Sequence, residues 1–346
     1  MSIVGDELRS KLQTYLATHW QQPVTVTDVR QIPGGASRET FRFRAARGDT
    51  SDGFVLRRDP PSSLIDTERR HEYLTYAAMV ATAIPVPEPI LLEEDATLLG
   101  GAFSIMREVP GCEASPALLA GPPYAAVKEQ LGQRAWSLLG QLARTSVTEL
   151  GVVEFMEVPE HPALRELDYW AEVIRADQLH PEPVAEAAIR WLYRHLPEPS
   201  SERVLVHGDY RSGNFLYNAE GEIKAILDWE MAHIGDPLED LAWSLDPLWS
   251  LDPHLAGNLL SREAALGVWE QASGISVDRS AFRWWQVFAS LKGLAIWISS
   301  TEDFHRGSTK EPILAMAGWV MTDRQNRILI DRLRPDGQQR WAEPLI

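Results

Sequence analysis

The chain has 346 residues, of which 45% are hydrophobic, and a formal net charge of −16. That length suits about two domains with separate cores, and the absence of any run of about 18 apolar residues argues against a membrane span. The acidic balance argues against nucleic-acid binding, which needs a basic face, although it would attract a cationic small molecule. The single cysteine, Cys112, excludes an internal disulfide and a cysteine-based zinc site. Residues 1–9 carry Asp6 and Glu7 and no apolar run, so we expect no secretory signal and a cytoplasmic protein.

The N-terminal third predicts a small lobe of strands and two helices. Apolar residues recur at helical intervals over residues 6–19 and 65–79, where Leu74 and Ala78 share one face. Strands are expected over residues 25–31, 40–45, 54–57, 90–93 and 102–107.

After Pro110 and Gly111 the pattern becomes mainly helical. Helices are expected over residues 131–146, over 184–196 and through the tryptophan-rich segment 238–333. Short strands are expected at 204–206, 215–217 and 223–227, the last two joined by a turn at 218–221. These patterns predict an α+β fold of two lobes. A small β-rich nucleotide-binding lobe would span residues 1–107, and a larger helical lobe for catalysis and substrate binding would span residues 108–346.

The strongest chemical signal is the run from His207 to Asn214. Its pattern, His-x-Asp-x-x-x-x-Asn, has the spacing of a kinase catalytic loop. Phosphoryl transfer needs a carboxylate that accepts or directs the proton of the attacking hydroxyl, and Asp209 has that position. The side-chain oxygen of Asn214 can help to hold a magnesium ion, which neutralises charge on the phosphates.

A second acidic residue, Asp228, ends the strand expected at 223–227. Protein kinases carry Asp-Phe-Gly at this place, and its aspartate holds magnesium. Asp228 fits that role, although Trp229 and Glu230 replace the Phe-Gly pair. The two motifs with a hairpin between them are far more specific than either one alone.

Together, His207-Gly208-Asp209, Asn214 and Asp228 resemble the signature of aminoglycoside phosphotransferases, choline kinases and related enzymes of the protein-kinase-like fold. The resemblance covers nearly the whole chain. It implies ATP and Mg²⁺ as cofactors, Asp209 as the catalytic residue, and Asn214 and Asp228 as metal ligands.

The segment after Asp228 extends this resemblance. Gly235-Asp236-Pro237 is followed by Asp240, as in related enzymes. Asp236 and Asp240 either brace the catalytic loop or cap the next helix, and a structural role is favoured over a catalytic one.

The resemblance also assigns nucleotide-binding residues in the first lobe. Gly34, Gly35 and Ser37 lie where a loop would cover the phosphates with backbone N–H groups. Arg57 stands in the strand that carries a phosphate-binding lysine in the family, and Glu72 on the next helix is its expected ion-pair partner. The neighbouring Arg58 is the alternative, but alternation along a strand points it to the opposite face.

Two further assignments follow from position in the family. Arg107 and Val109 occupy the hinge, where backbone groups meet the adenine. The run 55–61 (Val-Leu-Arg-Arg-Asp-Pro-Pro) resembles kinase domains associated with acyl-CoA dehydrogenases, which are thought to act on hydroxyacyl-CoA thioesters.

These features predict an ATP-dependent kinase that phosphorylates a hydroxyl of a small molecule. The acceptor stays open among an aminoglycoside, an amino alcohol and a hydroxyacyl-CoA. A protein kinase is disfavoured because Gly208 replaces the arginine of the His-Arg-Asp motif and no Ala-Pro-Glu segment follows Asp228. The alternative from another class is an inactive nucleotide-binding pseudokinase, which only the arginine at position 57 favours.

Overall fold

The computed structural model describes residues 3–32, 39–58, 66–252, 254–308 and 312–334. The chain divides into two compact units. The N-terminal unit comprises Met1–Glu113, Leu216–Asn218 and Lys224–Glu230, and the C-terminal unit comprises Ala114–Phe215, Ala219–Ile223 and Met231–Ile346. Within the described ranges, no helix is both long enough and apolar enough to cross a bilayer.

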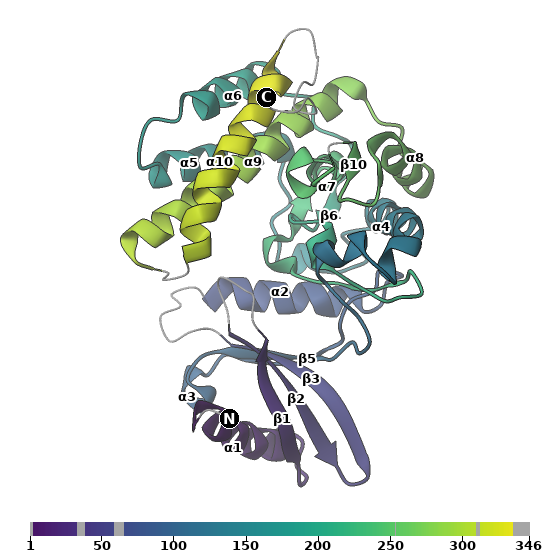
Figure 1. Ribbon diagram of the computed structural model, residues 1–346, viewed down its shortest axis with the longest axis vertical. Helices are drawn as coiled ribbons and strands as arrows, with labels where there is room; N and C mark the ends of the chain where they lie inside the picture. The colour runs from purple at the N-terminus through teal and green to yellow at the C-terminus, as the bar shows by residue number, and fades with distance from the viewer. Residues whose placement is uncertain (1–2, 33–38, 59–65, 253, 309–311, 335–346) are drawn as a thin grey trace. The chain divides into compact units, whose positions relative to one another are not determined.

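A five-stranded antiparallel sheet forms the centre of the N-terminal unit, with the strand order β1-β2-β3-β5-β4 (Figure 1). Its strands are β1 (Thr25–Ile32), β2 (Glu39–Arg47), β3 (Thr50–Arg58), β4 (Pro89–Glu93) and β5 (Phe103–Arg107). Each contains most or all of a strand predicted from the sequence. The antiparallel sheet follows from short connections between neighbours in the chain.

The first helix, α1 (Ile3–His19), packs its apolar side on the sheet (Figure 1). Three buried leucines, one for each turn, form that side: Leu8, Leu12 and Leu16. They share a core with Phe54 and Leu56, alternate residues of β3 that are almost completely buried. Because side chains alternate along a strand, Val55 and Arg57 face the other side of the sheet.

The second helix, α2 (Asp66–Met79), packs near β4 and β5. Its Glu72 meets Arg57 of β3 on the sheet face that does not carry the α1 core. A one-turn helix, α3 (Ala96–Leu99), connects β4 with β5.

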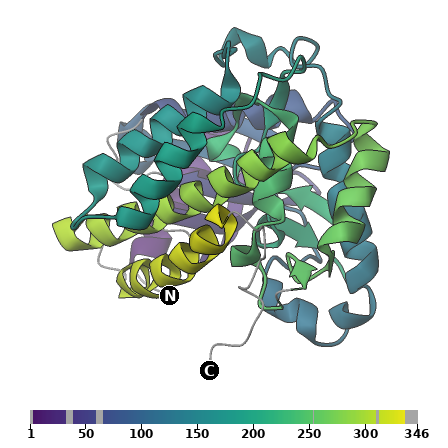
Figure 2. The ribbon, with the colours of Figure 1, turned by 90° about the horizontal axis from the view of Figure 1, so that it is seen from above.

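Helices dominate the C-terminal unit, and Figure 2 shows α5, α6, α9 and α10 lying side by side. The helices are α4 (Lys128–Leu142), α5 (Pro162–Asp177), α6 (Pro183–Arg194), α7 (Pro237–Ser244), α8 (Arg262–Ser273), α9 (Arg279–Arg306) and α10 (Pro312–Leu333). Helix α9 contributes Trp284 and Trp285 to the interior, where both are almost fully buried. Most of the described tryptophans are likewise buried, as expected for core residues, whereas Trp319 is 83% exposed.

The short strands pair differently from the single β island expected from the sequence. Strands β7 (Phe215–Tyr217) and β8 (Ile223–Ile226) form the predicted hairpin. Strand β6 (Val204–Val206) instead pairs with β9 (His233–Gly235), a strand that the sequence analysis did not predict. Helix α5 was also missed, and β10 (Leu255–Ala256) pairs with β11 (Leu260–Ser261) inside the segment expected to be helical.

Candidate active site

The predicted catalytic loop follows β6 in the C-terminal unit and is held by buried hydrogen bonds. The N–H groups of His207 and Gly208 donate to the two carboxylate oxygens of Asp240, at 2.6 and 3.0 Å. Gly208 has φ of +85°, and a Cβ added there would lie 2.5 Å from the carbonyl oxygen of Met231. Only glycine fits this position, because a larger residue would be both strained and in collision.

The Asp209 side chain is surrounded by three donors from its own unit. Arg211 Nε lies 3.0 Å from each carboxylate oxygen, Trp243 Nε1 donates to Oδ1 at 2.9 Å, and Asn214 Nδ2 donates to Oδ2 at 2.8 Å. The carboxylate is therefore oriented before any ligand arrives. The sequence pattern singled out Asn214 as a metal ligand, and it gave no signal for Arg211 or Trp243 as partners of Asp209.

The rest of the loop supports the same geometry. Asn214 Nδ2 also donates to the Asp209 carbonyl oxygen at 2.8 Å, which leaves the amide oxygen as the group suited to a metal ion. His207 is completely buried, and its Nδ1 accepts from the Asp209 N–H at 3.1 Å. These contacts make His207 an organiser of the loop.

The two aspartates after β9 have separate structural roles. Asp236 caps α7 by accepting from the Leu238 N–H at 2.8 Å, whereas Asp240 braces the catalytic loop. Burial raises the pKa of Asp236 to about 6, and burial also raises the pKa of Asp240. Both of the roles considered for this pair are therefore present, one on each residue.

Asp228 follows β8 and belongs to the N-terminal unit. Its backbone has φ of +69°, a left-handed conformation that aspartate tolerates better than most residues. The Asp228 N–H donates to the hydroxyl of Tyr76 on α2 at 2.8 Å, and the carboxylate is 34% exposed. Tyr76, which the sequence did not single out, thereby fixes the backbone of the predicted metal ligand.

The two terminal nitrogens of the Arg57 guanidinium contact Glu72 and Asp228. Arg57 forms an ion pair with Glu72, as predicted, and its Nη2 lies 3.4 Å from Asp228 Oδ1. Burial lowers the pKa of Arg57, but Glu72 and Asp228 raise it above its ordinary value, so the side chain stays charged. Arg58 bonds instead to Glu39 on the other face of the sheet, as strand alternation predicts.

The remaining nucleotide-binding predictions fall on the hinge and the glycine-rich loop. The Arg107 N–H donates to the carbonyl oxygen of Glu88 at 2.8 Å, so its own carbonyl oxygen is the backbone group suited to a nucleotide. Val109 follows two residues later and is partly buried. Gly34, Gly35 and Ser37 lie outside the described residues.

The predicted metal ligands have suitable chemistry for Mg²⁺. Asp228 offers a carboxylate and Asn214 an amide oxygen, and Mg²⁺ prefers such hard oxygen ligands. Arg57 approaches only one oxygen of Asp228, and the Asn214 amide nitrogen is already used within the loop. The donor set of the two residues fits the ion.

An antiparallel N-terminal sheet, a mainly helical remainder and this loop define a kinase-like phosphotransferase with an α+β fold. Residues 28–275 match the Phosphotransferase enzyme family (APH), and the chain belongs to this family.

The similar proteins include a larger curated relative and solved kinase-like structures. The chain is 30% identical over 227 residues to acyl-CoA dehydrogenase family member 11 of Gallus gallus, covering 65% of this chain and 28% of that protein. A choline/ethanolamine kinase family protein from Mesorhizobium loti superposes with a TM-score of 0.61 at 16% identity, covering 98% of each chain. The streptomycin–ATP complex of APH(2″)-IIa gives 0.56 at 14% identity, covering 83% of this chain and 90% of that one. The two structural matches show the shared fold.

Proposed function

We propose that the protein transfers the γ-phosphate of ATP to a hydroxyl group of a small molecule, with Asp209 as the residue that accepts or directs the hydroxyl proton. The observation that carries this proposal is the environment of Asp209. Its carboxylate sits on a loop braced by Asp240 and is oriented by three donors. Catalysis by such a site depends mainly on alignment, since phosphoryl transfer needs little covalent chemistry from the protein.

The N-terminal lobe, residues 1–107, would bind the nucleotide. Arg57, oriented by Glu72, would contact the phosphates, and Gly34, Gly35 and Ser37 would cover them with backbone N–H groups. The similarity to a structure that holds ATP supports this assignment.

The adenine and the metal ion complete the proposed nucleotide site. The Arg107 carbonyl and the Val109 backbone at the hinge would meet the adenine. Asn214 and Asp228 would hold Mg²⁺, which when bound supplies positive charge against the phosphate oxygens. The C-terminal lobe, residues 108–346, would carry Asp209 and the acceptor site.

The charge beside Asp209 favours one of the three acceptor classes. The guanidinium of Arg211 lies against the carboxylate and over the ring of Trp249, 5.0 Å from its centroid. Because Arg211 neutralises the Asp209 carboxylate, this carboxylate offers no net negative charge to attract the cationic aminoglycosides and amino alcohols, which leaves an anionic acceptor in favour. Glu302, a buried carboxylate of α9 that could otherwise attract a cationic acceptor, is already paired with Arg306. The similarity to an acyl-CoA dehydrogenase family protein agrees with a hydroxyacyl-CoA acceptor.

A coupled ADP-release assay tests the proposal. Mg-ATP is offered with hydroxyacyl-CoA thioesters, aminoglycosides and choline-like amines in parallel. We expect release with the thioesters, and a loss of about 100-fold or more in Asp209→Asn, because the amide cannot accept the proton. Glu202→Gln, which changes an exposed carboxylate, serves as the matched control. Equal rates in wild type and Asp209→Asn would refute the assignment of Asp209.

The second candidate function is nucleotide binding without turnover. Arg57 in place of the family's lysine is the feature that favours it. Measured ATP binding together with no acceptor-dependent ADP release across the panel would support this pseudokinase and contradict the kinase proposal.

A further inference from the structure

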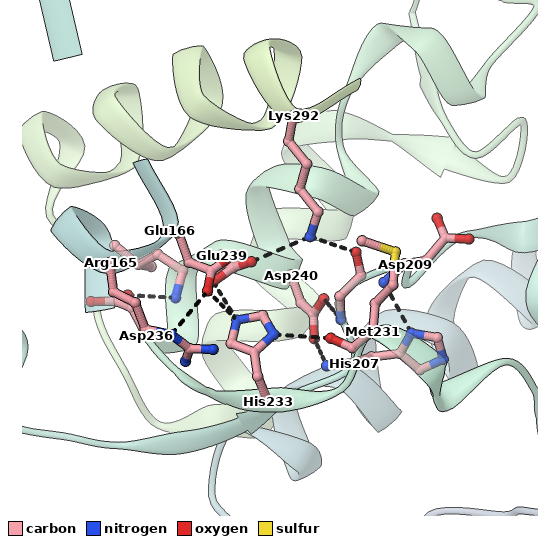
Figure 3. A network of polar contacts seen from close by, with 12 residues as sticks. Arg165, Glu166, His207, Asp209, Met231, His233, Asp236, Glu239, Asp240 and Lys292 are labelled. Carbon is pink, nitrogen blue, oxygen red and sulfur yellow. Dashed lines mark hydrogen bonds and ion pairs between the residues drawn. The ribbon is translucent and has the colours of Figure 1, made fainter. Parts of the chain in front are cut away.

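A chain of buried charged residues runs through the C-terminal unit behind the catalytic loop (Figure 3). It begins at Glu166 of α5 and continues through His233 of β9 and Glu239 of α7 to Lys292 of α9. His233 Nε2 lies 3.0 Å from Glu239 and 3.6 Å from Glu166, and Lys292 Nζ lies 3.4 Å from Glu239. Four elements thus contribute to one network, in which α5 and α9 are far apart in the sequence from each other and from the neighbouring β9 and α7.

The charges of this network balance one another. The ligand atoms of Glu166, His233 and Glu239 lie within 4.8 Å of one another, a spacing that could suit a metal ion. Lys292 already supplies a cation to Glu239, and the two carboxylates raise the pKa of His233 to about 9 despite its burial. Arg165 also lies 3.8 Å from Glu166, so the two carboxylates face three positive groups and leave no net negative charge for an ion to neutralise. The cluster is therefore a set of mutual ion pairs, of the kind that buried charges require.

The end of the network reaches the catalytic loop directly. Lys292 Nζ donates to the Gly208 carbonyl oxygen at 2.7 Å, and the lysine is 1% exposed. That carbonyl belongs to the peptide bond that joins Gly208 to Asp209. The Gly208 N–H donates to Asp240, so both the N–H and the carbonyl of this glycine bond to buried side chains. These bonds restrict a residue whose backbone is otherwise the most flexible.

A second contact leads from Lys292 to the carboxylate of Asp209. The ammonium lies 5.1 Å from the ring centroid of Trp243, within the range of a cation–π interaction. The same indole donates through Nε1 to Asp209 Oδ1 at 2.9 Å. Lys292 thus contacts both the backbone before Asp209 and the ring that orients its side chain.

We infer that Lys292 is a positioning residue for phosphoryl transfer, which sets the direction of the Asp209 carboxylate through the Gly208 carbonyl and the Trp243 ring. The inference rests on the proposed function, because the direction of the Asp209 carboxylate matters for catalysis only if Asp209 accepts or directs the hydroxyl proton. Glu166, His233 and Glu239 keep the lysine charged and in place inside the unit. Without the ammonium, the Gly208 carbonyl would be buried without this donor, and the peptide would rotate to find another.

The competing explanation is that Lys292 only balances the charge of Glu239. A pair of variants separates the two. Lys292→Met removes one positive charge, so that Glu239 and Glu166 share His233. Lys292→Met/Glu239→Gln restores the balance between His233 and Glu166 but still lacks the donor to Gly208. If Lys292 only balances charge, the double variant recovers the wild-type kcat. If Lys292 positions Asp209, kcat stays low in the double variant.

Two readouts apply to these variants. The first is kcat for phosphate transfer, which we expect to fall about 10- to 100-fold in both variants, with KM for ATP changed less than about twofold, because the Asp209 carboxylate is displaced from its productive position. Recovery of wild-type kcat in the double variant would overturn the inference.

The second readout needs no turnover and uses hydrogen exchange of indole N–H groups by NMR. Trp243 Nε1–H bonds to Asp209, while Trp136 Nε1–H bonds to Ser244 at 3.2 Å and serves as an internal control of folding. Trp243→Phe identifies the relevant signal. In the double variant we expect at least about tenfold faster exchange at Trp243 and unchanged exchange at Trp136. Unchanged exchange at both would overturn the inference, and this result can be read even if wild type transfers no phosphate to any acceptor.

Discussion

The catalytic loop of the C-terminal unit and the Arg57 group of the N-terminal unit hold their functional side chains in different ways. Asp209 depends on Asp240 and Lys292, whose side chains are buried, and on bonds to backbone groups. Arg57 and Asp228 pair with each other through side chains that are 19% and 34% exposed, and Arg57 also pairs with the buried Glu72. The first arrangement fixes a direction before a ligand binds. The second leaves charged groups accessible to a ligand that brings its own charges, such as a nucleotide with its phosphates.

The largest effect on stability is expected at the base of the catalytic loop. Asp240→Ala removes the acceptor for two buried N–H groups, and we expect the free energy of unfolding to fall by about 3 kcal/mol. Asp240→Asn keeps one acceptor oxygen and should lose about half as much. Urea denaturation measures both. Equal stability of Asp240→Ala and wild type would show that the loop does not depend on this brace.

A comparable effect, about 3 kcal/mol at most, is expected from the titration of His233, because each unit of pKa shift corresponds to about 1.4 kcal/mol. Its pKa in the folded protein is raised from 6.5 to about 9, since Glu166 and Glu239 outweigh burial and the opposing charge of Lys292. The protonated form is thus favoured by folding. Its stabilisation is fully present below pH 6.5 and is lost as the pH rises through about 9.

Chemical denaturation between pH 6 and pH 10 measures this loss. His233→Gln cannot titrate, so its stability should be lower at pH 6 and should change less over that range. A wild-type stability that rises between pH 7 and pH 9.5 by a similar amount would contradict the assignment of a charged His233.

The smallest of these effects concerns the contribution of the Arg57 group to nucleotide affinity. Arg57→Ala should raise KM for ATP about tenfold, because a phosphate contact is lost and Glu72 is left without its cation. Arg57→Lys should stay within about threefold of wild type. Arg58→Ala is the matched control, since Arg58 bonds to Glu39 on the other sheet face. An equal rise in KM for both alanine variants would remove the proposed role of Arg57.

Some contacts of the candidate site follow from local patterns. The spacing from His207 to Asn214 keeps Asp209 and Asn214 in one short loop, where their side chains bond, and strand alternation distinguished Arg57 from Arg58. The Arg57–Glu72 pair came from resemblance to a family, and the structure confirms this contact. Each prediction used residues that are close in the sequence or fixed by a motif.

The contacts that orient Asp209 from a distance could not be predicted in this way. Lys292 reaches Gly208 across 84 positions of the chain, from a helix that is otherwise rich in apolar residues. Trp243 is a buried core residue, but its indole N–H also donates to Asp209. Such pairings depend on how α7 and α9 pack, which no local pattern encodes.

The most direct test of the central claim is detection of the phosphorylated product. Wild type and Asp209→Asn are incubated with Mg-ATP and a hydroxyacyl-CoA, and the acceptor is analysed by mass spectrometry while ATP binding is measured by calorimetry. We predict that wild type adds one phosphate to the acceptor, and that Asp209→Asn binds ATP with similar affinity but forms product at least about 100-fold more slowly. Product formed at the same rate by both proteins would contradict the account.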